Sequence, residues 1–540
     1  MSSHSKVKRS REHWKQKASR RGDETRYLRK ELRRVKQERD TYKHRAQQAE
    51  RQGTARQLQA QRPAHCGKPD LVWLALQLFL VARIGFRAVS RVLAVLGPAL
   101  GLAKAPCPQT ISNWVTRLSL VRLQAASRLV GAPLRQAPFS NGFIWMIDIS
   151  IGLGSGKLLT VLALNAHHHQ LQPGAPALSQ VHCLAVAVAA SWTGEAIAAF
   201  LQRVMAVLGR PAAYLKDGGT ELRKAVRLVG ERGLPSLAID DISHLVAALL
   251  KRHYQAHPLF EPFLTACGKV SGHLKQTLQA CLAPPKVQTK ARFMNVHRLV
   301  RWAARVLQLS PVGRAAQGSM LAQLRACLDQ LPACKAFIKR FHADARPLLA
   351  CQQLLKTQGL SHATLTQCDP LVAAIPSAAV RGPFAHYLQA QLAIATTLGL
   401  AEVGLPISSD PIESLFGLAK QHGTGELQDA HRIAPRLPAL CGLPTRAEAH
   451  QVLEISVAQQ AQLTKGLTSL TKQRREVLTT PEGLDNLGRE PAAPPVELLP
   501  RPKNGPNQRE IIPISTGYTK AEGPQGRPQE RLPCPARAAR

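Results

Sequence analysis

The chain has 540 residues, 45% of them hydrophobic, which is enough apolar material for roughly three folded domains and excludes a wholly disordered protein. Its net charge of +38, from 72 Lys and Arg against 34 Asp and Glu, far exceeds what solubility requires and predicts a polyanionic partner, nucleic acid above all. The eleven cysteines include no C-x-x-C pair, which excludes the usual zinc half-site, and no apolar run is long enough to span a bilayer.

The first 60 residues concentrate this charge, with 19 Lys and Arg against 7 Asp and Glu. No proline interrupts the stretch from Arg11 to Gln61, and apolar residues such as Leu28 and Val35 recur seven residues apart. We therefore predict a basic helix over residues 1–62. Arg39 stands at a seam position, which argues against a tight zipper, so a weak coiled coil stays open beside a solvated single helix.

Residues 71–118 have the apolar spacing of three helices, the last beginning with a proline in its first turn. A short Gly- and Pro-bearing stretch joins the last two, which predicts a helix-turn-helix within a DNA-binding domain over residues 63–138, with an ordinary helical hairpin as the alternative. Ile111 and Trp114 would pack inward. The second helix would present polar side chains to the DNA major groove, namely Gln109, Thr110, Ser112, Asn113 and Arg117.

Between Asn141 and Tyr254 the pattern changes to three apolar, β-branched runs followed by alternating helices and strands. A short Gly-rich turn separates the first two runs, which favours an antiparallel hairpin. The predicted order is βββαβαβα, an α/β fold. Residues 256–400 then have only helical spacing, and after about Leu484 the composition turns to Pro, Gly, Arg and Asn without periodicity, which predicts a disordered basic tail.

Three acidic residues stand in informative contexts. Asp148 lies within the apolar run FIWMIDISI, where a carboxylate is costly to bury unless a metal or another partner compensates it. Asp217 follows the fourth predicted strand and precedes two glycines, although a helix N-cap is a competing role. Glu413 follows Pro411 in the first turn of an apolar helix, where the helix dipole alone would favour an acid.

Together these features resemble the DDE transposases of bacterial insertion sequences. The resemblance is carried by the three acids, the order βββαβαβα, the long helical stretch between the second and third acids, and the string SSDPIESLFGLAK. It covers roughly residues 140–255 and 405–425 and implies an RNase H-like catalytic core interrupted by an all-helical insertion. Asp241-Ile242-Ser243-His244 also resembles the D-x-x-H motif of Mutator-like transposases.

The resemblance implies metal-dependent phosphoryl transfer on DNA. Asp148, Asp217 and Glu413 would hold two Mg²⁺ ions, with Mn²⁺ as a substitute, which activate a water and then a 3′-hydroxyl. His244 would orient substrate or a side chain near the metals, although a structural role at a helix start is the more common one. Lys420 would contact a phosphate. Asp240 or Asp241 stays open as the second carboxylate, with Asp217 preferred because it follows the fourth strand.

The predicted division of the chain and its biological setting follow from that resemblance. The expected parts are the basic helix at 1–62, the helix-turn-helix domain at 63–138, the first part of the RNase H-like core at 139–255, the insertion at 256–400, the closing helices of the core at 401–484, and the disordered tail at 485–540. Expected partners are double-stranded DNA, both transposon ends and target, and further copies of the chain on DNA, in the bacterial cytoplasm at the nucleoid, without membrane contact.

Two other classes of protein fit the same sequence features. One is a non-catalytic DNA-binding protein derived from a transposase. The other is an RNase H-like nuclease or resolvase that cuts DNA without joining strands.

Overall fold

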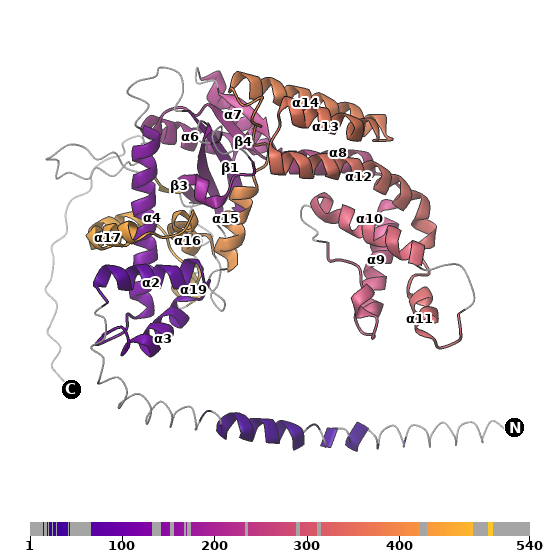
Figure 1. The fold of residues 1–540 in the computed structure, drawn as a ribbon, viewed down its shortest axis with the longest axis horizontal. Helices are drawn as coiled ribbons and strands as arrows, with labels where there is room; N and C mark the ends of the chain where they lie inside the picture. The colour runs from indigo at the N-terminus through magenta and orange to yellow at the C-terminus, as the bar shows by residue number, and fades with distance from the viewer. Residues whose placement is uncertain are drawn as a thin grey trace, which may run out of the picture. The chain divides into compact units, whose positions relative to one another are not determined.

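The structure is a computed structural model with a mixed α/β architecture (Figure 1). It describes residues 66–131, 142–151, 156–166, 169, 174–232, 236–287, 292–309, 315–421, 429–478 and 495–499, with parts of a helix between Lys15 and Lys43. The strands are β1 (Phe143–Ile151), β2 (Lys157–Asn165), β3 (Val181–Ala189), β4 (Ala213–Lys216), β5 (Leu237–Asp240) and β6 (Val496–Leu498). The helices among them are α6 (Gly194–Leu208), α7 (Thr220–Glu231) and α8 (Ile242–Tyr254). The predicted order βββαβαβα is therefore confirmed.

All six strands form one sheet in the order β5-β4-β1-β2-β3-β6. The hairpin of β1 and β2 is antiparallel, as predicted, and β3 continues antiparallel to β2. On the other side β4 pairs parallel to β1 and β5 pairs parallel to β4. β2 is buried at seven consecutive positions, and six of these seven residues are apolar, Thr160 being the exception, so its sequence does not alternate between apolar and polar residues. Three neighbouring parallel strands, β1, β4 and β5, thus end at one edge of the sheet.

The two faces of the sheet carry separate cores. Side chains such as Trp145, Ile147 and Tyr214 point to one face and pack against α6 and α7. The alternate residues, among them Met146 and Leu215, point to the other face and join the core of α8 and the helical segment beyond it. Because side chains alternate along a strand, a residue's position in β1 or β4 decides which of these two cores it meets.

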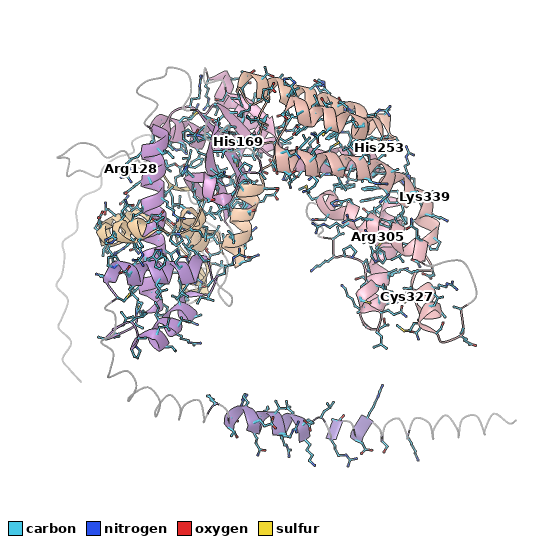
Figure 2. All side chains as sticks on the ribbon, viewed as in Figure 1. Arg128, His169, His253, Arg305, Cys327 and Lys339 are labelled. Atoms are coloured by element: carbon cyan, nitrogen blue, oxygen red, sulfur yellow. The ribbon has the colours of Figure 1, made fainter. Side chains whose placement is uncertain are left out.

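The predicted insertion contains only helices as regular elements within its described residues, as expected. They are α9 (Phe260–Leu274), α10 (Arg292–Leu309), α11 (Met320–Cys327), α12 (Lys335–Gln358), α13 (His362–Ala373) and α14 (Ala378–Thr397), with short 3₁₀ turns between some of them. His253 lies on α8 (Figure 2), with its ring 3.2 Å from the Ser377 hydroxyl at the start of α14. Asp344 of α12 accepts hydrogen bonds from Ser377 N and the Tyr254 hydroxyl. The insertion therefore shares buried contacts with α8.

Three helices before the sheet form a third core. They are α2 (Lys68–Leu80), α3 (Phe86–Leu96) and α4 (Pro108–Gly131), and Ile111 and Trp114 are buried as predicted. Residues after the insertion belong to the same core, including Ala449 and Val452 of α17. The chain between them contributes α15 (Asp410–Gln421), α16 (Ala430–Ile433), the 3₁₀ helix Ala434–Leu440, α17 (Arg446–Glu454), α18 (Val457–Leu463) and α19 (Leu470–Leu478).

Arg122 of α4 joins the predicted DNA-binding and closing segments. Its guanidinium donates to both carboxylate oxygens of Glu448, at 2.8 and 3.2 Å, and to the carbonyl oxygens of Ala439 and Cys441. A largely buried guanidinium needs several acceptors to compensate its lost hydration. The predicted segments 63–138 and 401–484 are therefore packed against each other.

The prediction of a disordered tail over residues 485–540 is wrong at β6. Val496 to Leu498 pair antiparallel with β3, and Leu498 is only 1% exposed. Arg203 of α6 donates a hydrogen bond to the Glu497 carboxylate at 2.9 Å, and this contact connects β6 to α6. A strand of only three residues, with Leu498 as its buried apolar residue, is too short for its pattern to be recognised within a Pro-rich sequence. The rest of the predicted tail lies outside the described residues.

The described positions between Lys15 and Lys43 are helical, as predicted for the basic segment. Leu28, Leu32 and Val35 each have more than half of their surface exposed. Coiled-coil pairing through them stays a prediction. Among the described residues no helix is long and apolar enough to cross a membrane.

Candidate active site

The pairing of the parallel strands brings three aspartates into one row. Ile147 pairs with Lys216, and Lys216 pairs with Asp240. One position further along each strand stand Asp148, Asp217 and Asp241. Because neighbouring residues of parallel strands point to the same side, all three carboxylates lie on the face that meets α8 and the insertion.

The Asp148 carboxylate lies in an environment that favours its protonated form. Burial, with the negative charge of nearby Asp217 adding to it, raises the pKa of Asp148 to about 7, while His244 acts in the opposite direction. Its own side-chain oxygen accepts a hydrogen bond from Ile149 N at 2.6 Å. A partly buried acid with a second carboxylate beside it has the electrostatic character of a cation-binding or proton-transferring group.

Asp217 begins the turn between β4 and α7. One of its oxygens accepts a hydrogen bond from Gly219 N at 2.9 Å. A side chain at position 219 would bring its Cβ within 2.8 Å of that oxygen, so the Asp217 carboxylate would have to shift to make room for it. Asp217 is only partly buried and lines a pocket. The alternative role of Asp217 as the N-cap of α7 is not seen, since Gly219 occupies that position.

Glu413 and His244 face each other across the ends of two helices. Glu413 lies in the first turn of α15, His244 lies in the first turn of α8, and Nε2 of His244 is 3.4 Å from Oε1 of Glu413. Burial lowers the pKa of His244, but the contact with Glu413 and the charges of Asp241 and Asp217 outweigh it and raise that pKa to about 9. The His244 contact in turn lowers the pKa of Glu413, with Lys356 adding to the effect. At neutral pH the pair is imidazolium and carboxylate.

Asp241 has a different environment from its two neighbours. It is 1% exposed and caps α8, where it accepts a hydrogen bond from His244 N at 2.8 Å. Its other oxygen accepts from Ser409 N at 2.6 Å and from the Ser409 hydroxyl at 2.9 Å. Ser409 directly precedes α15, whose residue Glu413 donates its backbone N–H to the Ser409 carbonyl. Asp241 therefore joins the starts of α8 and α15, with both oxygens already occupied.

Asp240, the remaining alternative, points the other way. It forms an ion pair with the buried Lys216 ammonium, while its backbone carbonyl accepts from the Tyr387 hydroxyl at 2.6 Å. Lys216 occupies the strand position whose side chain lies on the opposite side from Asp217. Of the candidates for a second carboxylate, Asp217 alone combines an available oxygen with nearness to Asp148.

A second group of contacts links the insertion to this site. Lys356 of α12 lies 2.7 Å from Asp410 Oδ1 at the start of α15, and 3.3 Å from the Ser243 hydroxyl on α8. Gln352, one turn earlier, donates to the same hydroxyl at 2.9 Å. Sequence reasoning missed these residues, since an isolated Lys and Gln on a long helix carry no local signal.

Asp148, Asp217 and Glu413 have the chemistry of ligands for divalent cations, but their side chains are not arranged around an ion. Among the described residues no three His, Cys, Asp or Glu side chains stand close enough together to hold an ion. Asp148, Asp217 and Glu413 nevertheless offer only carboxylate oxygens, the ligands that Mg²⁺ prefers. Burial and the charge of Asp217 raise the pKa of Asp148, so its ionised form lacks full compensation by the surrounding groups. A cation would supply that compensation.

The predicted DNA-reading residues of α4 are divided by the fold. Gln109 is exposed in the first turn, and its amide donates to Asn113 at 3.0 Å. Asn113 also accepts from Gln460 of α18, and Arg117 donates to the Gln460 amide oxygen at 2.8 Å. The C-terminal part of the predicted reading face thus contacts α18. In its N-terminal part, Gln109 is exposed.

The other predicted DNA contacts have simpler surroundings. The hydroxyl of Thr110 lies 3.2 Å from the Cys107 thiol, and Ser112 is partly buried. Lys420 is exposed in the last turn of α15. It follows Glu413 by seven residues, which places it on about the same side of the helix and about 10 Å further along the axis. Their roles in DNA binding stay predictions.

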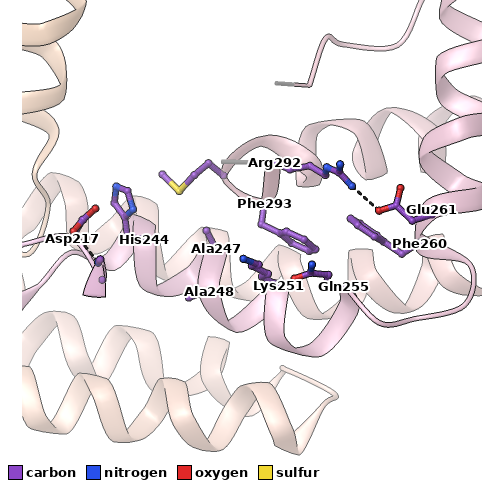
Figure 3. A pocket seen from close by; sticks show the side chains of 13 residues that line it. Asp217, His244, Ala247, Ala248, Lys251, Gln255, Phe260, Glu261, Arg292 and Phe293 are labelled. Atoms are coloured by element: carbon purple, nitrogen blue, oxygen red, sulfur yellow. Dashed lines mark hydrogen bonds and ion pairs between the residues drawn. The ribbon is translucent and has the colours of Figure 1, made fainter. Parts of the chain in front are cut away.

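A pocket of about 540 Å³ opens beside Asp217 and His244 (Figure 3). It extends from Asp217 and His244 along α8 to α9 and α10, as the close-up shows. Its lining includes Lys251 of α8 and Arg292 of α10 as positively charged groups. Arg292 lies 2.7 Å from Glu261, so Lys251 is the lining cation for which no acidic partner is found in the described part of the chain.

No protein-family model and no curated protein matches this chain. Among solved structures it is similar to the Drosophila P element transposase strand transfer complex, with a TM-score of 0.38 and 9% sequence identity. The match covers 74% of this chain and 98% of that chain. A likeness at this level carries no conclusion about the function of this protein.

Proposed function

We propose that this protein is a DDE transposase, a metal-dependent enzyme that cleaves DNA at transposon ends and joins them to target DNA. The observation that carries the proposal is the gathering of Asp148, Asp217, His244 and Glu413, which are spread over 266 positions of the sequence, at one edge of the sheet. Their positions on β1, after β4 and on a helix beyond an all-helical insertion agree with the RNase H-like scheme that the sequence resembles.

The residues present support roles for each of these groups. Asp148, Asp217 and Glu413 would hold two Mg²⁺ or Mn²⁺ ions, which when bound supply Lewis-acid stabilisation and an activated water or 3′-hydroxyl. His244 keeps Glu413 near the two aspartates through their ion pair. The N-termini of α8 and α15, joined through Asp241, add positive potential where phosphate charge would accumulate.

The high positive charge of the chain supports the choice of DNA as the substrate. Gln109 and Lys420 are exposed and offer contacts to DNA bases and phosphates. We further propose that several copies of the chain assemble on the two DNA ends, as joining two ends to one target requires.

The test uses the full chain and a plasmid carrying the genomic DNA that flanks its gene. With Mg²⁺ or Mn²⁺ we expect cleavage at discrete ends and joined products. Asp148→Asn, Asp217→Asn and Glu413→Gln should each reduce cleavage at least about 100-fold, since loss of groups that merely support metal ligands already costs 10- to 100-fold. Asp369→Asn, on the exposed surface of α13, serves as the matched control and should cleave normally.

Product analysis separates the alternatives. Cleavage without joined strands would indicate a nuclease or resolvase. DNA binding without metal-dependent cleavage would indicate a non-catalytic DNA-binding protein. Wild-type cleavage by all three variants would contradict the assigned site.

A further inference from the structure

One face of α8 leads away from the carboxylates as an open, positively charged path. His244, Ala247, Ala248, Lys251 and Gln255 all line the pocket, at the spacing of one side of a helix (Figure 3). The opposite side of α8 is apolar and buried. Ala247 and Ala248, between His244 and Lys251, have short side chains, so a ligand backbone can lie close to the helix along this face.

We propose that this pocket binds the single DNA strand that continues from the cleaved bond, through its phosphates. The inference rests on the proposed function, because it takes the carboxylates as the point of cleavage. Lys251 lies seven residues beyond His244, about 10 Å along the helix axis, a distance that a short stretch of one DNA strand spans. Its ammonium would therefore meet a phosphate a few nucleotides from the cleaved bond.

The size and lining of the pocket favour an unpaired strand over a duplex. A volume of about 540 Å³ accommodates nucleotide-sized groups but not the width of a double helix. Phe260 and Phe293 also line it, but they are 0% and 7% exposed, so they form its floor and offer no ring face for base stacking. Recognition would be of the backbone, without base specificity.

Crosslinking within the full chain tests this placement. Gln255 and Arg252 are both exposed on α8, but only Gln255 lines the pocket. With p-benzoylphenylalanine in place of Gln255, we expect ultraviolet light to link the protein to a labelled duplex that carries an oligothymidine overhang. With the same group in place of Arg252, or with a blunt duplex, the yield should be at background.

Charge variants of Lys251 complete the test. Lys251→Ala should weaken overhang capture at position 255 by about five-fold, the weight of one exposed ion pair, and Lys251→Arg should restore it. Equal yields at positions 252 and 255, or no effect of Lys251→Ala, would overturn the inference. Crosslinking at position 255 does not require cleavage. Crosslinks in a protein that fails to cut DNA would therefore count against the proposed function alone. DNA cleavage without these crosslinks would count against this inference alone.

Discussion

Asp148→Asn is expected to stabilise the metal-free protein at pH 8 by up to about 4 kcal/mol. Burial and the neighbouring Asp217 raise the pKa of Asp148 from 3.8 in the unfolded chain to about 7 in the fold. The folded protein thus binds one more proton than the unfolded chain between these two values, and wild-type stability falls as the pH rises through this range. Each pH unit is worth about 1.4 kcal/mol. Asparagine has the shape of the protonated acid and avoids that loss.

Urea unfolding of both proteins in the presence of EDTA, from pH 4 to pH 8, measures this effect. The difference in the free energy of unfolding should be near zero at pH 4, grow up to pH 7 and then level off. Asp369→Asn controls for the general effect of removing an acid from the surface of this highly basic chain. A difference that does not change with pH, or an Asp148→Asn variant that is less stable than the wild type at pH 8, would contradict this electrostatic description of the site.

Asp241→Asn is expected to destabilise the protein by about 3 kcal/mol. The Asp241 carboxylate accepts hydrogen bonds from His244 N, Ser409 N and the Ser409 hydroxyl in a site that is 1% exposed. Burial raises the pKa of Asp241, and the Ser409 hydrogen bonds oppose that rise. An amide keeps one acceptor oxygen but turns donor hydrogens toward N–H or hydroxyl groups, and an unsatisfied buried group costs about 1 to 3 kcal/mol.

The Asp241→Asn substitution should loosen the start of α15 in the folded protein, in addition to lowering the free energy of unfolding of the whole protein. Because Asp241 connects the starts of α8 and α15, hydrogen exchange in the first turn of α15 should rise in Asp241→Asn more than exchange in β2 at the centre of the sheet. Asp369→Asn is again the control, with no expected change in either segment. Unchanged stability and unchanged exchange at α15 would show that the contact between Asp241 and Ser409 does not hold the helix that carries Glu413.

The order of strands and helices was predictable because period-two and period-3.6 apolar spacing are local properties of the chain. Asp148 was identifiable for the same reason, since a lone acid inside FIWMIDISI contradicts its surroundings. The environment of Glu413 was not predictable, because His244 and Lys356 reach it from elements 169 and 57 residues away in sequence. Such contacts depend on how helices pack, not on local pattern.

The choice between Asp217 and Asp241 shows the same limit. Both follow short strands and both precede helices, so their local sequences are nearly equivalent. The difference lies in Ser409, a residue 168 positions beyond Asp241, which occupies the Asp241 carboxylate. Gln460 of α18 likewise forms hydrogen bonds with Asn113 and Arg117 of α4, which are more than 340 positions away in sequence.

We propose that Asp148, Asp217 and Glu413 bind divalent cations together. Calorimetric titration of the full wild-type chain with Mn²⁺ at pH 8 tests it directly, without DNA and without catalysis. We predict saturable binding of about two ions per chain, with one or both sites lost in Asp148→Asn, Asp217→Asn and Glu413→Gln but not in Asp369→Asn. No saturable binding by the wild type, or unchanged binding by all three variants, would contradict the account.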